Sequence, residues 1–93
     1  MKVYWRESRA GLRLILDSGA GQEEEVGGVR RTPRGFDAIA KTLGYDPGRA
    51  QRGFPTLEDA KAFVESFHPW DIYTGTADVE LDATVHPMLE ESR

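Results

Sequence analysis

The chain has 93 residues, of which 39% are hydrophobic and 30% charged, and its formal net charge is −4. This composition is too apolar for a disordered chain, and the length leaves room for one domain spanning residues 1–93. The chain lacks cysteine, which argues against a disulfide-stapled secreted domain. No apolar run is long enough for a signal peptide or a membrane span, so we expect a cytoplasmic protein without a membrane partner.

The charges are distributed unevenly along the chain. Residues 1–55 are basic on balance, although Glu23, Glu24 and Glu25 interrupt them. Residues 56–93 hold nine acids against Lys61 and Arg93. This division predicts a bipolar surface.

The first 17 residues have the pattern of a β-hairpin. Apolar side chains alternate with polar ones over residues 2–8 and 12–17, and the short connection between them ends in Gly11. Residues 18–28 then hold four glycines and three consecutive glutamates, which predicts a mobile, acidic, Gly-rich loop. A third strand is expected over residues 26–32, weakened by its glycines.

Two helices are expected in the middle of the chain. Phe36, Ile39, Ala40 and Leu43 have the spacing of one helix face, which predicts a helix over residues 34–43 ending at Gly44. A turn is expected over residues 45–48. Thr56 is a suitable N-cap for a second helix, and Pro69 and Trp70 end it.

The last part of the chain predicts two short strands and a tail. Residues 72–74 are expected to form a strand, and residues 78–85 alternate between acidic and apolar side chains. Residues 88–93 are expected to fray. The sequence therefore predicts an α+β fold, a small antiparallel or mixed sheet of three to five strands with two helices on one face. Its expected core comprises Val3, Trp5, Leu12, Leu14, Leu16, Phe36, Ile39, Leu43, Leu57, Ala60, Phe63, Val64, Phe67, Leu81 and Val85.

Catalytic motifs are missing from the sequence. It offers no thiol and no Gly-x-Ser-x-Gly elbow, and both histidines precede proline. The segment from His68 to Asp71 is interpreted as a rigid helix stop, with the alternative that Asp71 orients the His68 ring. We therefore expect a protein that is not an enzyme.

Metal and nucleotide sites have no clear signature either. Asp78, Glu80 and Asp82 share one strand face about 6.5–7 Å apart, which is wide for a single ion, and we interpret them as the acidic face of an edge strand. Residues 19–24 begin a dinucleotide-type glycine pattern, but Glu24 stands at its last glycine. No metal and no cofactor is expected.

Arginine is the strongest signal of binding. It outnumbers lysine nine to three, and its planar guanidinium suits phosphate or carboxylate. The candidate binding residues are Arg6, Arg9, Arg13, Arg30, Arg31, Arg34, Arg49 and Arg52. They either gather on one side of the domain as an anion-binding surface or pair with the surplus acids.

The predicted hairpin, third strand and following helix resemble small three-strand-plus-helix domains that lay a sheet on DNA. The arm-binding domains of tyrosine recombinases and plant AP2 domains are examples, and the likeness includes the helix start at residues 54–64. The additional helix over 34–43 and the acidic last strand depart from that pattern.

Two functions remain open. The first is a small, non-enzymatic binding protein with a bipolar surface, an adaptor or inhibitor of a larger protein that handles nucleic acid, of the kind encoded by phages and mobile elements. Acidic residues 71–91 would then dock on a basic partner. The alternative is a nucleic-acid-binding module that uses its arginines.

Overall fold

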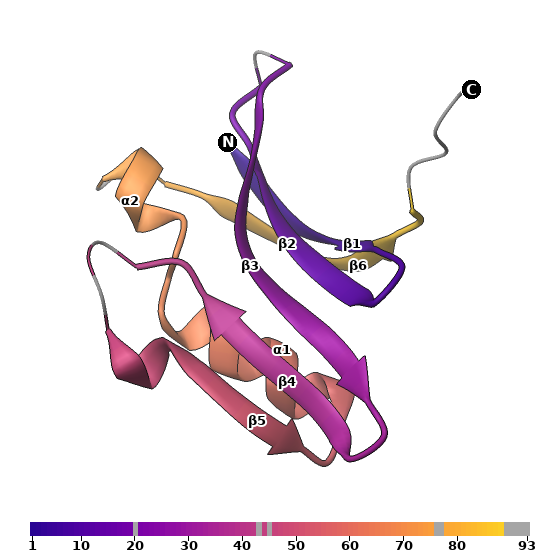
Figure 1. The fold of residues 1–93 in the computed structure, drawn as a ribbon. Coiled ribbons are helices and arrows are strands. Elements are labelled where there is room, and N and C mark those ends of the chain that lie inside the picture. The colour runs from indigo at the N-terminus through magenta and orange to yellow at the C-terminus, as the bar shows by residue number, and fades with distance from the viewer. Residues whose placement is uncertain (20, 43, 45, 76–77, 89–93) are drawn as a thin grey trace.

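The chain forms one six-stranded sheet with a helix on one face (Figure 1). The computed structural model describes residues 1–19, 21–42, 44, 46–75 and 78–88. The strand order is β5-β4-β3-β2-β1-β6, and every neighbouring pair is antiparallel except β1 and β6, which run parallel. The elements are β1 (Lys2–Glu7), β2 (Gly11–Asp17), β3 (Glu23–Thr32), β4 (Gly35–Ala40), the 3₁₀ turn η1 (Pro47–Arg49), β5 (Ala50–Phe54), α1 (Leu57–Ser66), α2 (Asp71–Thr74) and β6 (Glu80–His86).

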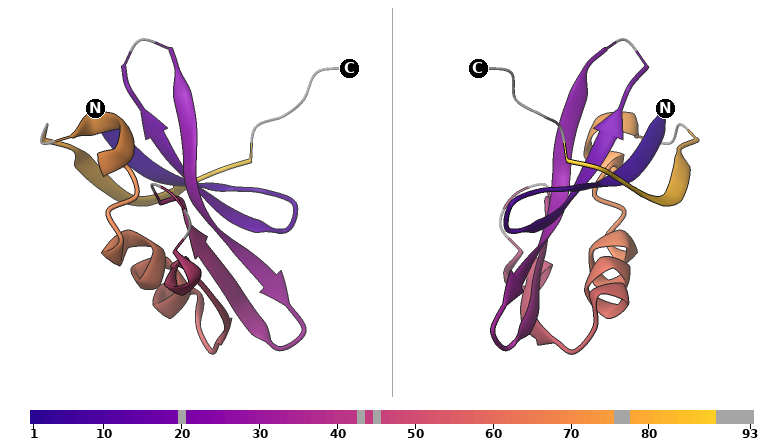
Figure 2. Two further views of the ribbon diagram at one scale, coloured as in Figure 1. Left: turned by 60° about the vertical axis from the view of Figure 1, so that its left-hand side comes forward. Right: turned by 90° about the vertical axis from the view of Figure 1, so that its right-hand side faces the viewer.

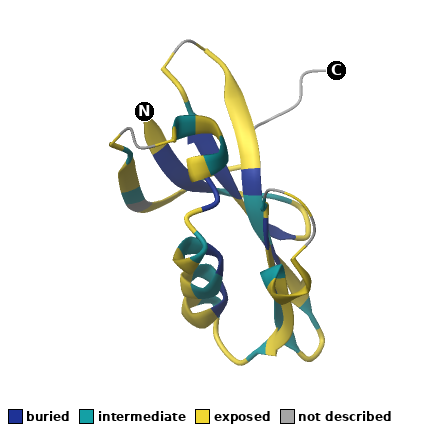
Figure 3. Cartoon of the chain, turned by 90° about the vertical axis from the view of Figure 1, so that its left-hand side faces the viewer, coloured by how far each residue is buried: buried dark blue, intermediate teal, exposed yellow. Residues whose placement is uncertain are grey.

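The helix α1 covers one face of the sheet, over β3, β4 and β5 (Figure 2). We call this the helix face and the opposite one the open face. Alternating side chains of each strand point to the two faces. The helix face carries most of the buried core. Its strand residues are Val3, Trp5, Leu12, Leu14, Leu16, Val26, Val29, Ala38 and Ala40, and Ala60 and Val64 of α1 and Trp70 belong to the same cluster. Figure 3 shows this burial on the inner side of α1 and along the central strands.

The predicted hairpin is confirmed. Strands β1 and β2 pair antiparallel, with Val3 opposite Leu16 and Trp5 opposite Leu14. These side chains are buried because they all point to the helix face. The indole nitrogen of Trp5 donates a hydrogen bond to Glu65 of α1 over 2.7 Å, which ties the hairpin to the helix.

The predicted start of α1 is also confirmed. The Thr56 hydroxyl accepts a hydrogen bond from the Asp59 amide, as an N-cap does. At the other end His68 takes a positive φ of 48°, which stops the helix before Pro69.

The expected number of strands was wrong, and so was the first of the two expected helices. The sheet has six strands instead of three to five, and residues 34–43, expected to be the first helix, contain strand β4. The pattern is ambiguous because Phe36, Ala38 and Ala40 also alternate with period two. Pairing with β3 on one side and β5 on the other satisfies the backbone of β4 and selects the strand.

Several boundaries differ as well. Residues 23–28, expected in the mobile loop, belong to β3, so the connection between β2 and β3 covers residues 18–22 only. Residues 72–74 lie in the one-turn helix α2 instead of a strand. Strand β6 is present, but Leu81 and Val85 are exposed, and so is Ile39 of β4. The core prediction was wrong for these three. Leu43, Tyr45 and residues 89–93 of the expected tail lie outside the described residues.

Candidate functional site

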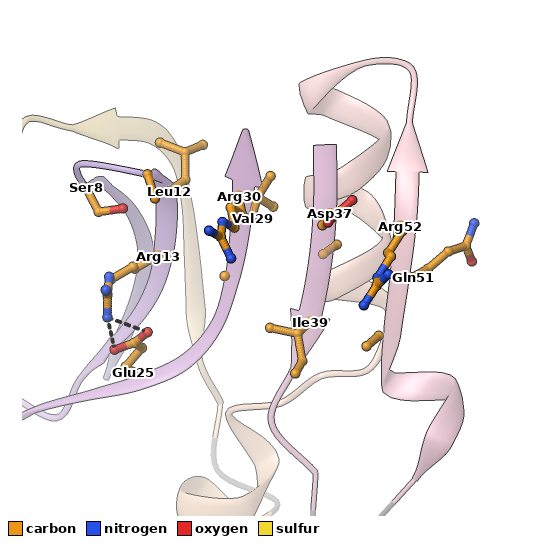
Figure 4. A pocket seen from close by; sticks show the side chains of 14 residues that line it. Ser8, Leu12, Arg13, Glu25, Val29, Arg30, Asp37, Ile39, Gln51 and Arg52 are labelled. Carbon is orange, nitrogen blue, oxygen red and sulfur yellow. Dashed lines mark hydrogen bonds and ion pairs between the residues drawn. The ribbon is translucent and has the colours of Figure 1, made fainter. Parts of the chain in front are cut away.

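A hollow of about 430 Å³ lies on the open face, where strands β2 to β5 run side by side (Figure 4). Its charged and polar lining comes from Arg13, Glu25, Arg30, Asp37, Gln51 and Arg52, and Ile39 and Ala50 add apolar surface. A site of this size suits a small group or a short peptide segment. It lies on the face that α1 leaves uncovered.

The hollow exists because small residues occupy several positions of two adjacent cross-strand rows. The first row runs Arg13, Gly28, Ile39 and Ala50 across β2 to β5. Gly28 has no side chain and Ala50 has only a methyl group. Neither neighbour covers the Ile39 side chain, which remains 44% exposed. The adjacent row begins with another glycine, Gly11, opposite Arg30.

That second row places two guanidinium groups on either side of one carboxylate. Arg30 of β3 lies opposite Asp37 of β4, and Arg52 of β5 lies beyond Asp37 (Figure 4). One Asp37 oxygen accepts a hydrogen bond from the Gly53 amide over 3.0 Å. Neither Arg30 nor Arg52 has a carboxylate within ion-pair distance among the described residues. The row therefore carries a surplus positive charge.

Two other open-face arginines are already neutralised. Arg13 donates to both oxygens of Glu25 at 2.8 and 2.6 Å, and the two side chains are about half exposed. Arg6 donates to Glu23 over 2.7 Å. Exposed pairs of this kind contribute little to stability, so an incoming anion can compete for Arg13.

Tyr4 joins the Arg6–Glu23 pair in a small network. Its hydroxyl donates to Glu23 over 2.5 Å and accepts from Arg6 over the same distance. Burial of the ring and the hydrogen bond to Glu23 raise the pKa of Tyr4 to about 12. Hydrogen bonds from Arg6 and Tyr4 lower the pKa of Glu23, so the acid stays ionised.

Strand β3 carries its acidic and its basic residues in different halves. Its first half carries Glu23, Glu24 and Glu25, and its second half carries Arg30 and Arg31. Glu23 and Glu25 form ion pairs with Arg6 and Arg13 of the β1–β2 hairpin, so these two acids do not neutralise the basic half of β3. The β2–β3 hairpin extends beyond the rest of the sheet and carries the acidic half with it (Figure 2).

The eight candidate arginines do not form one continuous patch. Arg6, Arg13, Arg30 and Arg52 lie on the open face, whereas Arg31 lies on the helix face, opposite Phe36. Arg9 and Arg34 lie in the β1–β2 and β3–β4 turns, and Arg49 ends the turn η1. The structure brings three of them, Arg13, Arg30 and Arg52, to the hollow.

The remaining candidates lie apart from the hollow. The His68 ring lies against Trp70, with ring centroids 5.0 Å apart, and within the described residues it makes no hydrogen bond to the Asp71 carboxylate. Asp82 accepts from Thr84 and lies 3.1 Å from His86, and these bonds hold the pKa of its carboxyl well below its usual range. Asp78 and Glu80 are exposed. Within the described part of the chain no three His, Asp or Glu side chains are placed to hold a metal ion.

Sequence reasoning missed the other residues of the hollow: Gly28, Asp37, Ile39 and Gln51. Asp37 and Ile39 were assigned to the predicted helix, where they would lie on different faces. Period-two alternation through β4 was the signal that could have placed both on one side of a strand.

Comparison of the chain with protein-family models, with curated proteins and with solved structures finds no match. None of the helices that the structure describes is both long and apolar enough to cross a bilayer.

Proposed function

We propose that the chain is a small, non-enzymatic binding protein, an adaptor or inhibitor, whose open face binds an acidic segment of a protein partner. One observation carries the proposal: Arg30 and Arg52 line the same hollow, and no carboxylate of the described residues pairs with either of them. Guanidinium groups form strong, charge-assisted hydrogen bonds with carboxylates. The exposed Ile39, in the adjacent cross-strand row, offers an apolar contact of the kind found at protein interfaces.

The spacing of the two guanidinium groups specifies the partner further. Strands β3 and β5 are separated by β4, so their axes lie about 9.5 Å apart. An extended peptide advances about 3.3 Å per residue. Side chains two residues apart point to the same side of an extended peptide, about 6.6–6.8 Å apart, and the long arginine side chains can span the difference. An acidic segment that crosses these strands therefore matches both arginines when its two carboxylates are two residues apart.

A nucleic acid fits the same face less well. A strand long enough to cross the sheet would approach Asp17, Glu23 and Glu25, which repel phosphate. The aromatic side chain on this face, Tyr4, is buried and offers no stacking surface. The net charge of −4 also disfavours binding of a polyanion. Arg9, Arg31 and Arg34 lie near the basic end of β3. They would contribute to binding if the partner were a nucleic acid, so substituting them tests this alternative.

Fluorescence anisotropy with a defined probe tests the proposal. The probe is a blocked, labelled peptide with two glutamates two residues apart, and its control carries glutamines at both positions. We expect the acidic peptide to bind and Arg30→Gln or Arg52→Gln to weaken binding about tenfold, since each removes a charge-assisted contact. Arg31→Gln, a matched change on the helix face, should leave the affinity unchanged.

Two results would count against this function. Equal affinity for the acidic and glutamine peptides would remove the role of the carboxylates. Tighter binding of single- or double-stranded DNA at low salt, weakened by Arg31→Gln as much as by Arg30→Gln, would favour the nucleic-acid-binding module instead.

A further inference from the structure

The end of the hollow next to strand β2 holds two arginines with glycines between them. Arg13 of β2 lies opposite Gly28 of β3, and Gly11 of β2 lies opposite Arg30 of β3. The arginines therefore occupy one diagonal of these two adjacent cross-strand pairs, and the glycines occupy the other. Diagonal neighbours of an antiparallel pair lie about 7–8 Å apart, so both guanidinium groups can reach one group placed between them.

The space between these arginines is open and carries a further donor. A Cβ atom at Gly28 would approach the Leu12 carbonyl oxygen to 3.4 Å, an ordinary van der Waals distance. Ser8 of the β1–β2 turn lines the same end of the hollow and adds a hydroxyl group (Figure 4). The β2 end therefore has room and donors for an anion with several oxygens.

Charge makes the two ends of the hollow unlike. Between Arg30 and Arg52 stands the Asp37 carboxylate, which limits the negative charge that the β5 end attracts (Figure 4). Between Arg13 and Arg30 the register places glycines instead. Glu25, the acid bound to Arg13, lies on the other side of the Arg13 row from Arg30. Two positive charges at the β2 end thus match an anion of two negative charges.

Arg13 can exchange its partner at little cost. It donates to both oxygens of Glu25, but the two side chains are 53% and 49% exposed, and exposed pairs contribute little to stability. A phosphate monoester carries close to two negative charges at neutral pH and three acceptor oxygens. It therefore offers two guanidinium groups more than the single charge of a glutamate does.

We propose that the partner's acidic segment carries a phosphorylated serine or threonine whose phosphate binds between Arg13 and Arg30, while a carboxylate two residues away binds Arg52. The phosphate site rests on the proposed function and makes it more specific, because it names the chemistry of one of the two acidic groups. Arg13 leaves Glu25 and joins Arg30 on the phosphate, and the Ser8 hydroxyl can donate to a third oxygen.

Anisotropy measurements with three labelled peptides test the phosphate site. One is the two-glutamate probe, and in the other two phosphoserine replaces its first or its second glutamate, so that both directions of the segment across the face are covered. We expect one of the phosphopeptides to bind about tenfold more tightly than the two-glutamate peptide, since two guanidinium groups share the added charge. If both phosphopeptides bind no more tightly than the two-glutamate peptide, the phosphate site is overturned and the proposed function stands.

Variants of the Arg13–Glu25 pair identify the arginine that distinguishes phosphate from carboxylate. Arg13→Gln should weaken binding of the tighter phosphopeptide about tenfold and of the two-glutamate peptide only about twofold. Glu25→Gln should tighten binding of the phosphopeptide about threefold, because it frees Arg13 and removes a nearby negative charge. Glu24→Gln, the matched change at the next residue on the opposite face, should leave the affinity unchanged. Circular dichroism verifies that each variant folds.

Three further results would contradict the phosphate site. Arg13→Gln could weaken both kinds of peptide by the same factor, which would remove any special role of Arg13 toward phosphate. Inorganic phosphate could displace the phosphopeptide at equal concentration, which would assign the β2 end to the free ion instead of a phosphorylated segment. Failure of all three peptides to bind would overturn the proposed function together with the phosphate site.

Discussion

Two adjacent glycines of β3 serve opposite faces of the sheet. A Cβ atom at Gly27 would lie 2.5 Å from a methyl group of Val64 in α1 and 3.2 Å from the Ile39 carbonyl oxygen. A Cβ atom at Gly28 would meet only the Leu12 carbonyl oxygen, at 3.4 Å. Gly27 therefore allows α1 to pack closely on the sheet, whereas Gly28 keeps the floor of the hollow open.

Gly27→Ala should lower the free energy of unfolding by about 1–3 kcal/mol, because the helix must move to admit the methyl group. Gly28→Ala should change it by less than about 1 kcal/mol and serves as the control at the next residue. Chemical denaturation of both variants measures the difference. Equal losses would mean that α1 does not approach the sheet at Gly27.

The buried hydroxyl of Tyr4 makes stability depend on pH in the alkaline range. In the unfolded chain the phenol ionises near its ordinary pKa of 10.0, whereas in the folded chain the pKa of Tyr4 is about 12. Between these values the folded state binds more protons than the unfolded one. The stabilisation is therefore complete below pH 10 and is lost as the pH rises toward 12.

Tyr4→Phe should remove the part of the stability loss at alkaline pH that ionisation of Tyr4 causes. The variant should be less stable than the natural chain below pH 10 by about 1 kcal/mol, since the hydrogen bond to Glu23 is gone. The difference between the two proteins should shrink as the pH approaches 12. Denaturation curves recorded across this range provide the measurement, and a difference that is constant with pH would contradict the assignment.

At the scale of elements, local signals predicted the hairpin and α1 but not β4. The alternation in β1 and β2 and the Thr56 N-cap are local patterns. They can be recognised without knowing which distant segments pack against them. Residues 36–40 fit a helix and a strand equally well, and only their pairing with β3 and β5 decides between them. Strand β5 has no buried residue and therefore no apolar alternation to detect.

Ile39 distinguishes the two interpretations of this segment by experiment. On the open face of a strand, Ile39→Ala should cost less than about 1 kcal/mol, whereas a core position in a helix would cost about 2–5 kcal/mol. Val26→Ala, at a fully buried position of β3, provides the reference for a core loss. Thermal unfolding of the two variants compares them, and similar losses would contradict the exposed placement of Ile39.

At the scale of the whole molecule, the sequence identified the arginines as candidate binding residues. It did not show which of them form ion pairs with glutamates. Segment charges indicate a bipolar chain, and β3 does carry acids in one half and bases in the other. Antiparallel pairing brings Arg6 and Arg13 of the hairpin to the acidic half. This sorting depends on strand register, which a charge count along the chain does not contain.

The hollow could not be predicted for the same reason. Arg13, Arg30 and Arg52 come from three strands, and they meet only because β4 is a strand between β3 and β5. With residues 34–43 taken as a helix, Arg52 had no defined position relative to Arg30. One wrong element therefore concealed the site, although its charged residues were already candidates.

Chemical-shift mapping with the acidic peptide tests most directly whether the open face binds anions. Backbone amide signals of the labelled natural chain are followed as the two-glutamate peptide is added. The account predicts shifts concentrated at the hollow, on residues 28–30 of β3, 37–39 of β4 and 50–52 of β5, with little change in α1. Shifts confined to α1 or β6, or none at all, would contradict it.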